Sequence, residues 1–306
     1  MSALGQGIRD YLALRQGLGF KLSDTARYLP TFARFLDEHG AACITTPTAI
    51  RWATQSATAG QAHWARRLTM VRLFALYWSA HDPRTEVPPA GAIPGRWRRI
   101  QPYLYSDDEI RRLIHAARQL GTSTGLRPET YATLFGLLVV TGMRIGEVIA
   151  LDSDDVDLDT GVLTIRRAKF GKSRLVPVHD STRAALRRYA LCRSRIYPRP
   201  STPSFLLGER GRRLTWWAVR WTFIQLSRQI GLRGPTDTHG PRLHDFRHRF
   251  AVHTMLNWYR AGVDVEQHIP RLATYLGHTH VTDTYWYLTA VPELMQLVAA
   301  RLEDKP

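Results

Sequence analysis

ETYATLFGLLVVTGMRIGEVIAL, residues 129–151, is followed by GVLTIRR, residues 161–167, and SRLVPV, residues 173–178, and the change of pattern between them decides the fold. The first stretch is apolar on both sides of Gly142, which predicts a buried helix, a glycine turn and a second, shorter helix. The two later runs are β-rich and are joined by AKFGK, which predicts a hairpin. We therefore expect a mainly α domain with a small antiparallel β-sheet.

Helical periodicity also precedes this domain. It recurs in residues 8–20, 25–40, 46–54 and 63–81, and it predicts an all-helical N-terminal domain over residues 1–82. Five prolines and two glycines then predict a linker over residues 83–104, which carries Arg96, Arg98 and Arg99. The second domain, residues 105–306, opens with a capping box formed by Ser106 and Glu109. Further helices are expected over residues 181–195, 215–231, 244–262 and 292–302.

The composition points to a polyanionic partner. The chain has 306 residues and a formal net charge of +16, and its hydrophobic fraction of 44% is enough for a sizeable core. Residues 1–95 hold 10 lysines and arginines against 6 acidic residues, and the remainder holds 32 against 20. Both parts are therefore basic, which favours a nucleic acid as the partner. An arginine-rich genome would raise the charge in the same way, and composition alone leaves that alternative open.

Several classes of protein are disfavoured. No apolar run reaches the length of roughly 20 residues needed to span a membrane, and the first residues lack the apolar core of a signal peptide. We therefore expect a cytoplasmic protein of bacterial type. Cys43 and Cys192 are too few for a disulfide framework or a thiolate metal cluster.

Lysine is rare in this basic chain. Only four of the 42 basic residues are lysines, and two of these, Lys169 and Lys172, stand together in AKFGKS. Arginine grips phosphate but effectively never releases its proton, whereas lysine can do so. A lysine at the predicted hairpin is therefore a candidate general acid.

Three other segments hold candidate residues. Arg144 and Glu147 are three residues apart after the glycine turn, although a structural salt bridge would show the same spacing. His244 and Arg247 share one helical turn in LHDFRHRFAVH. His278 follows Gly277 and begins the last candidate segment.

A metal site is the rival interpretation of the histidines. His244, Asp245 and His248 imitate the spacing of a zinc-binding His-Glu-x-x-His motif. Three arginines crowd the same turns and disfavour a divalent cation, and aspartate is shorter than the glutamate that this motif requires. We therefore predict no metal site.

The segment LGHTHVTDTYWYL, residues 276–288, holds two tyrosines, Tyr285 and Tyr287. Residues two apart on a helix differ by a rotation of about 200°, so only one of them can face a given site. Arginines, a lysine, histidines and a tyrosine in one domain match metal-free phosphoryl transfer. In that reaction a tyrosine oxygen attacks a phosphodiester, guanidinium groups stabilise the developing charge, and an acid protonates the departing hydroxyl.

These residues resemble the tyrosine recombinase (phage integrase) family over roughly residues 105–290. TGMRIGEVIAL resembles the first arginine box, KFGKSRLVPV the β-hairpin lysine, HDFRH the His-x-x-Arg box and LGHTHVTDTYWYL the terminal block. The resemblance implies that Arg144, Arg247 and His278 grip the scissile phosphate, that Lys169 is the general acid, and that His244 assists proton transfer from the tyrosine. Residues 1–82 would be the core-binding domain that clamps the partner, double-stranded DNA.

The resemblance also separates the two tyrosines. The family's nucleophile stands nine residues after this histidine, which selects Tyr287 and leaves Tyr285 for packing or DNA contact. A helix break is expected between histidine and tyrosine, with Gly277 as a C-cap and Thr279 or Thr282 as a new N-cap.

The remaining site assignments concern support and DNA contact. Glu147 is predicted to support Arg144, and the predicted DNA-binding residues are Arg96, Arg98, Arg99, Lys172 and Arg174. Arg249 departs from the family pattern, in which a small hydroxyl residue commonly follows the His-x-x-Arg box and its next histidine. The linker and PYLYSDDEI further resemble recombinases carried by mobile elements.

The resemblance implies site-specific recombination through a 3′-phosphotyrosyl intermediate and a Holliday junction. Four protomers, as two dimers, would act on two DNA sites without a cofactor, at the nucleoid, with accessory recombinases or DNA-bending proteins as further partners. The helix PELMQLVAARL, residues 292–302, would complete its own core or dock on a neighbouring protomer. The alternatives are a type IB topoisomerase and a non-catalytic DNA-binding regulator with the same fold.

Overall fold

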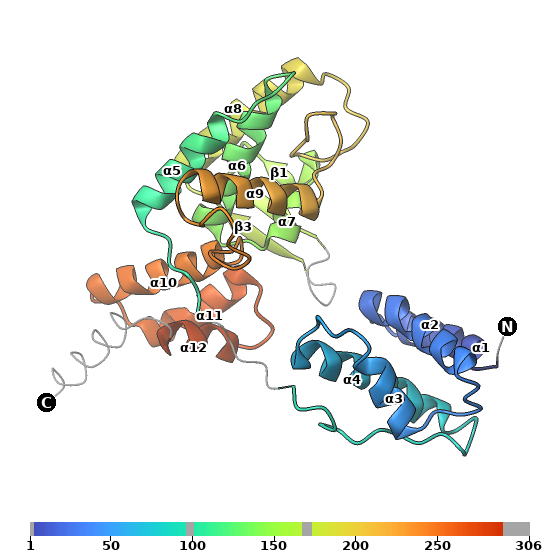
Figure 1. The fold of residues 1–306 in the computed structure, drawn as a ribbon. Helices are drawn as coiled ribbons and strands as arrows, with labels where there is room; N and C mark the ends of the chain where they lie inside the picture. The colour runs from blue at the N-terminus through green and yellow to red at the C-terminus, as the bar shows by residue number, and fades with distance from the viewer. Residues whose placement is uncertain (1–2, 96–100, 167–172, 290–306) are drawn as a thin grey trace, which may run out of the picture. The chain divides into compact units, whose positions relative to one another are not determined.

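The computed structural model describes residues 3–95, 101–166 and 173–289, and it divides into two compact units, Met1–Ile100 and Gln101–Pro306. Each unit has a hydrophobic core of its own. In the first unit the described residues form four helices: α1 (Ala3–Gly17), α2 (Ser23–Glu38), α3 (Thr46–Ala53) and α4 (Gln61–Trp78) (Figure 1). This agrees with the four periodic segments of the sequence.

The aromatic core of the first unit is built where these four helices meet. Phe32, Trp52 and Phe74 are each at most 1% exposed, and their burial supplies the apolar contact that short helices need for stability. Part of the predicted linker packs against this unit. Ile93 belongs to its core, and the Glu86 carboxylate accepts a hydrogen bond from the backbone N–H of Thr46 (2.8 Å).

The second unit is mainly helical with a three-stranded antiparallel sheet. Its described elements are α5 (Asp107–Arg118), α6 (Leu126–Thr141), α7 (Ile145–Ala150), η1 (Ser153–Asp155), β1 (Val156–Asp157), β2 (Val162–Ile165), β3 (Arg174–Pro177), α8 (Asp180–Ile196), α9 (Trp216–Gln229), α10 (Asp245–Arg260), α11 (Val265–Leu276) and α12 (Thr282–Thr289). The predicted fold class is confirmed. The capping box of α5 is also confirmed, because the Glu109 carboxylate accepts from the Ser106 N–H (2.7 Å) and the Ser106 hydroxyl accepts from the Glu109 N–H (3.2 Å).

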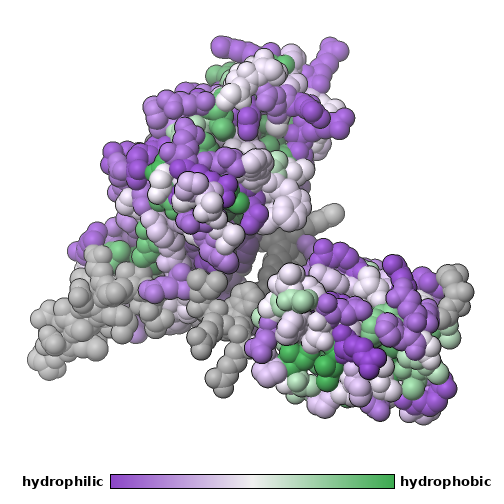
Figure 2. All heavy atoms as spheres, viewed as in Figure 1, coloured by the Kyte–Doolittle hydropathy of each residue, from purple (hydrophilic) through white to green (hydrophobic). Residues whose placement is uncertain are grey.

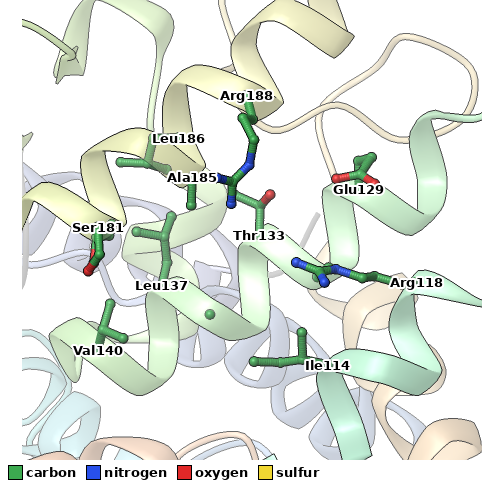
Figure 3. A pocket seen from close by; sticks show the side chains of 13 residues that line it. Ile114, Arg118, Glu129, Thr133, Leu137, Val140, Ser181, Ala185, Leu186 and Arg188 are labelled. Carbon is green, nitrogen blue, oxygen red and sulfur yellow. The ribbon is translucent and has the colours of Figure 1, made fainter. Parts of the chain in front are cut away.

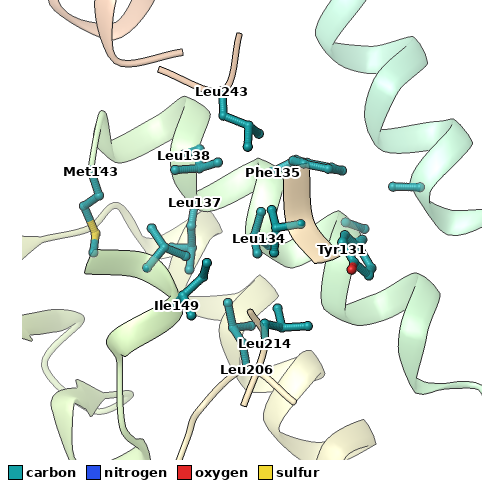
Figure 4. Close-up of a cluster of buried hydrophobic side chains, with 14 of the residues drawn as sticks. Tyr131, Leu134, Phe135, Leu137, Leu138, Met143, Ile149, Leu206, Leu214 and Leu243 are labelled. Atoms are coloured by element: carbon teal, nitrogen blue, oxygen red, sulfur yellow. The ribbon is translucent and has the colours of Figure 1, made fainter. Parts of the chain in front are cut away.

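Helix α6 is the centre of this unit. It contacts α5, α8 and α10, and its apolar residues are buried on several sides, as expected for a helix enclosed by others. Figure 4 shows Leu134, Phe135 and Leu138 from this helix beside Leu243 from the segment that leads into α10. The helix ends at Gly142, whose φ of 59° lies in the left-handed region. A Cβ at this position would lie 2.6 Å from the Phe250 ring, so the turn requires glycine.

The sheet follows the predicted order, β1-β2-β3, with both pairs antiparallel. Val162 pairs with Pro177 and Ile165 pairs with Arg174, so the ladder leads toward the hairpin connection. That connection, residues 167–172, lies outside the described residues. Arg174 is therefore the first described strand residue after the segment that carries the two lysines.

Helices α10, α11 and α12 pack together around a separate hydrophobic cluster (Figure 1). Helix α11 was not predicted from the sequence. It ends at Leu276, and its C-cap Gly277 has a φ of 69°. Helix α12 begins at Thr282, so the predicted break between His278 and Tyr287 is confirmed, with Gly277 as the cap.

The segment that begins the second unit packs against α10. Tyr105 stacks on Phe246 with ring centroids 4.3 Å apart, and its hydroxyl donates to the Arg242 carbonyl (3.0 Å). Arg249 donates from Nε to the Tyr105 carbonyl (2.8 Å) and also pairs with Asp107. The residue that departs from the family pattern thus fastens the start of the unit to α10.

Hydrophilic side chains cover much of the visible face of each unit (Figure 2). Among the residues that the structure describes, none of the helices combines the length and the apolar character needed to cross a bilayer.

Candidate active site

Two arginines from distant parts of the sequence meet at the end of α11. Arg144 precedes α7 and donates from Nη2 to the Gly277 carbonyl (3.1 Å). Arg247, on the first turn of α10, donates from Nη2 to the Leu276 carbonyl (2.7 Å). The last carbonyls of a helix have no partner within it, and they carry its partial negative charge, so they are suited to hold cations.

Arg247 is almost fully buried and Arg144 is not. The Arg247 residue is 2% exposed, and its Nη1 also donates to the Gly142 carbonyl (2.9 Å), the αL cap of α6. The side chain of Arg144 is 29% exposed and can reach a ligand from the surface. Burial, followed by the charge of Arg144, lowers the pKa of Arg247 to about 10. The guanidinium therefore stays charged near pH 7, in a site that favours an added anion.

Glu147 is the carboxylate of this cluster. It accepts from Arg144 Nη1 (2.8 Å) and from the Arg144 backbone N–H (2.9 Å), and it also pairs with Arg174 (2.8 Å). Burial raises its pKa, but the hydrogen bonds from Arg174 and Arg144 outweigh burial and lower the pKa to about 2. Glu147 is thus ionised over the whole working pH range, and it holds the Arg144 side chain in place.

The two histidines of the site are neutral near pH 7, although His244 is exposed and His278 is only partly buried. Desolvation by the surrounding protein and the neighbouring charge of Arg247 lower the pKa of both His244 and His278 to about 4. A neutral imidazole can accept a proton, which a general base must do. Nδ1 of His278 lies 2.7 Å from the hydroxyl of Thr284, a fully buried residue. When that hydroxyl donates to Nδ1, the proton of the ring is on Nε2 and is available to a phosphate oxygen.

The two tyrosines occupy different environments on α12. Tyr285 is 43% exposed, whereas Tyr287 is 3% exposed and belongs to the cluster of α10, α11 and α12. The ring of Tyr287 stacks on His278 with centroids 6.0 Å apart, and its phenol lies close enough to Arg247 for that charge to act on it. Burial raises the pKa of Tyr287, and the charge of Arg247 opposes that increase. Of the two phenols, only Tyr287 touches the arginine cluster.

The structure therefore brings together six of the predicted residues: Arg144, Glu147, His244, Arg247, His278 and Tyr287. Residues 104–293 match the family model described as "Phage integrase family". The chain belongs to the phage integrase family.

Relatives of known sequence and structure agree with this membership. The chain is 51% identical over 310 residues to a putative integrase/recombinase, y4rB, of Sinorhizobium fredii, and the match covers all of this chain and 98% of the relative. The fold is similar to that of the Tn1549 transposon integrase in complex with transposon right end DNA, with a TM-score of 0.67, 15% identity and 99% of each chain covered. It is also similar to a lambda integrase tetramer bound to a Holliday junction, with a TM-score of 0.63, 18% identity, and 93% and 76% of the two chains covered.

Five predicted residues of this phage integrase family member lie outside the described residues: Lys169, Lys172, Arg96, Arg98 and Arg99. Arg174 is described, and its position differs from the surface DNA contact that we predicted. Its side chain is 10% exposed, and its guanidinium pairs with Glu147. The sequence could not show this, because a strand residue beside a basic hairpin faces outward or inward depending on a register that the hairpin segment sets.

Two residues near Tyr287 were not predicted. His248 packs edge-on against Tyr287 with centroids 5.4 Å apart, and burial together with His244 lowers its pKa to about 3. Thr284 fixes the ring of His278. His248 was visible in the sequence only as part of the rejected zinc motif. Within the described residues, no group of three or more histidine, cysteine or acidic side chains is placed to hold a metal ion.

A cavity elsewhere in the second unit is not part of this site. It has a volume of about 280 Å³, lies between α5, α6 and α8, and has the side chains of Arg118 and Arg188 directed into it (Figure 3). None of its lining residues belongs to the arginine cluster. The candidate active site is therefore separate from this cavity, and it is defined by convergent charged groups.

Two histidines that are buried or partly buried predict a pH dependence of stability. His248 and His278 have folded-state pKa values of about 3 and 4, below the ordinary value of 6.5. Between these limits the unfolded chain binds more protons, so the free energy of unfolding falls as the pH falls from 6.5 toward 4. We expect the DNA-free melting temperature to drop by several degrees in that window, at about 2–4 °C per kcal/mol for a unit of this size. Calorimetry at stepped pH would measure it, and a flat profile from pH 6.5 to 4.5 would contradict it.

Proposed function

We propose that this phage integrase family member breaks and rejoins duplex DNA at specific sites through a 3′-phosphotyrosyl link at Tyr287. Family membership itself makes the chain a DNA strand-transferring enzyme of site-specific recombination. The observation that carries the residue assignment is the packing of the buried Tyr287 ring on His278 and His248, beside the guanidinium of Arg247.

The steps of the reaction follow from the chemistry of these groups. The Tyr287 oxygen forms a bond to the scissile phosphorus, and the bond from phosphorus to the 5′ oxygen breaks. Neutral His244 takes the phenolic proton, and Lys169 gives a proton to the departing 5′ oxygen. The freed 5′-hydroxyl of a partner duplex then attacks the phosphotyrosyl link, which reverses these proton transfers and releases Tyr287.

The charge of the site supports this assignment. Arg144, Arg174 and Arg247 are three cations against the single carboxylate of Glu147. A phosphodiester gains negative charge on its non-bridging oxygens as the tyrosine attacks, so a site with excess positive charge stabilises the transition state more than the ground state. We assign contact with those oxygens to Arg144, Arg247 and His278.

We also propose how the protein assembles. The lambda integrase tetramer bound to a Holliday junction has a similar fold. We propose that this chain likewise forms a tetramer of two dimers on two DNA sites, and that it exchanges strands through such a junction. The fold shared with a transposon integrase supports recombination of a mobile element as the biological setting. The substrate would place the protein in the cytoplasm at the nucleoid, with accessory recombinases or DNA-bending proteins as further partners.

A suicide duplex tests the proposed function. A duplex nicked just beyond the scissile phosphate loses its short 5′-hydroxyl fragment on cleavage, so the covalent complex cannot be resealed. The recombination site would first be selected from random-sequence duplexes by recovery of trapped protein. We expect a protein–DNA adduct that survives denaturing electrophoresis, and peptide mapping of the adduct should identify Tyr287. Absence of any adduct under conditions of specific DNA binding would favour a non-catalytic regulator.

The same preparation separates recombination from topoisomerase activity. A synthetic four-way junction built from two copies of the selected site should be resolved into two linear duplexes. Relaxation of supercoiled plasmid without junction resolution would instead assign type IB topoisomerase activity.

A further inference from the structure

Three consecutive backbone carbonyls at the end of α11 each accept a hydrogen bond from a different arginine. The pairs are Arg174 Nε to the Tyr275 oxygen (2.8 Å), Arg247 Nη2 to the Leu276 oxygen (2.7 Å) and Arg144 Nη2 to the Gly277 oxygen (3.1 Å). These are carbonyls that the helix cannot satisfy internally, at its partially negative end. One helix end therefore orients three cations that come from β3, α10 and the turn before α7.

Arg174 differs from the other two because its second partner is a carboxylate. Its Nη1 donates to Glu147 Oε1 (3.0 Å), and its Nη2 donates to Glu147 Oε2 (2.8 Å). The same two oxygens hold Arg144, through its Nη1 and its backbone N–H. The side chains of Arg174 and Glu147 are 10% and 9% exposed. Arg174 and Arg144 thus share one buried carboxylate and one helix end.

Three nitrogens of Arg174 are therefore bonded to groups of its own chain, and the guanidinium faces inward. Its packing is close, because a Cβ at position 277 would lie 2.8 Å from Arg174 Nη1. The bidentate contact matches the planar fork of arginine, which lysine cannot reproduce. This arrangement suits a group that fixes its neighbours rather than one that contacts DNA.

We propose that Arg174 is a positioning residue for strand transfer: it fixes Glu147 against the end of α11, so that Arg144 presents its guanidinium to the scissile phosphate. The inference rests on the proposed function, because it concerns the same site. Without Arg174, the Glu147 carboxylate would be held by Arg144 alone and could rotate, and the Arg144 guanidinium would keep only the Gly277 carbonyl as a fixed partner. Displacement of a catalytic group by about 1 Å can lower a rate by about 10²-fold.

The test compares Arg174→Lys and Arg174→Gln with the wild type. Three quantities are measured: the single-turnover rate of adduct formation on the suicide duplex, the dissociation constant for the uncleaved duplex across a range of salt concentrations, and the melting temperature. We expect the cleavage rate to fall by about 10- to 100-fold, with DNA affinity within about twofold and the salt dependence unchanged. Arg187→Gln is the matched control, since Arg187 pairs with Asp159 outside the site and should cleave at the wild-type rate.

A double mutant shows whether Arg174 acts through Glu147. If it does, Glu147→Gln combined with Arg174→Gln should cleave no more slowly than the slower single variant. Additive losses of cleavage rate would show that Arg174 does not act through Glu147. If Arg174→Gln fails to fold, the lysine variant keeps the test open, because it retains the charge without the fork.

Two other outcomes would overturn the inference. Weaker DNA binding with a salt slope reduced by about 1, at an unchanged cleavage rate, would show that Arg174 contacts a phosphate. Wild-type cleavage by both variants would show that the contact is structural only. A wild-type protein that forms no adduct at all would instead contradict the proposed function, so the two failures are distinguishable.

Discussion

Tyr287→Phe should abolish the covalent protein–DNA adduct, with a loss of at least about 10⁴-fold in the cleavage rate, because phenylalanine has no oxygen to attack phosphorus. The variant should still fold. Tyr287 is 3% exposed and packs against its cluster through the ring, which phenylalanine keeps. The loss of the phenolic hydroxyl beside Arg247 should change the free energy of unfolding by only about 1 kcal/mol. Denaturing electrophoresis after incubation with the suicide duplex measures the adduct, and gel shift measures the retained binding.

Tyr285→Phe is the matched control. It makes the same chemical change two residues away on α12, at a side chain that is 43% exposed. We expect adduct formation at close to the wild-type rate. Trapping by Tyr287→Phe, with loss of trapping in Tyr285→Phe, would reverse the assignment of the nucleophile.

Arg247→Gln should lower the cleavage rate by about 10²- to 10³-fold, the usual result of removing one preorganised group that stabilises transition-state charge. Glutamine is long enough to keep one donor near the carbonyl of Gly142 or Leu276, and it removes a buried cation that Arg144 repels. We therefore expect the free energy of unfolding to change by less than the activation free energy of cleavage. Single-turnover cleavage and calorimetry on the same preparation measure the two effects.

Arg249→Gln is the control for the loss of a buried arginine from α10 at a position outside the site. Arg249 is also buried on α10, but its partners are the Tyr105 carbonyl and Asp107. Its replacement should lower the melting temperature and leave the cleavage rate of the folded protein within a few fold, when both are measured well below that temperature. Cleavage by Arg247→Gln within threefold of the wild type would contradict the role of Arg247.

Much of the fold could be predicted because its signals are local. The capping box of Ser106, the glycine turn at Gly142 and the change to β-rich runs each depend on a few neighbouring residues. Helix α11 was missed although its apolar residues recur at helical spacing, since Pro270 stands inside it and proline usually interrupts a helix.

The residues that meet at the site could be predicted from the sequence, but the contacts between their side chains could not. Arg144, His244, Arg247, His278 and Tyr287 stand in recognisable local patterns. The inward direction of Arg174 depends on strand register and on contacts with residues 27 and 101 positions away, and no spacing rule supplies either.

The Tyr287 phenol and the Arg247 guanidinium belong to one chain, and both lie next to the same helix end. If α12 keeps this position on DNA, each subunit of the proposed assembly would supply its own phenol and guanidinium and would cut the strand that it holds. A subunit without the phenol and a subunit without the guanidinium would then fail to complement each other, however well they assembled. The subunits of such an assembly would then differ only in the order in which they cut their strands.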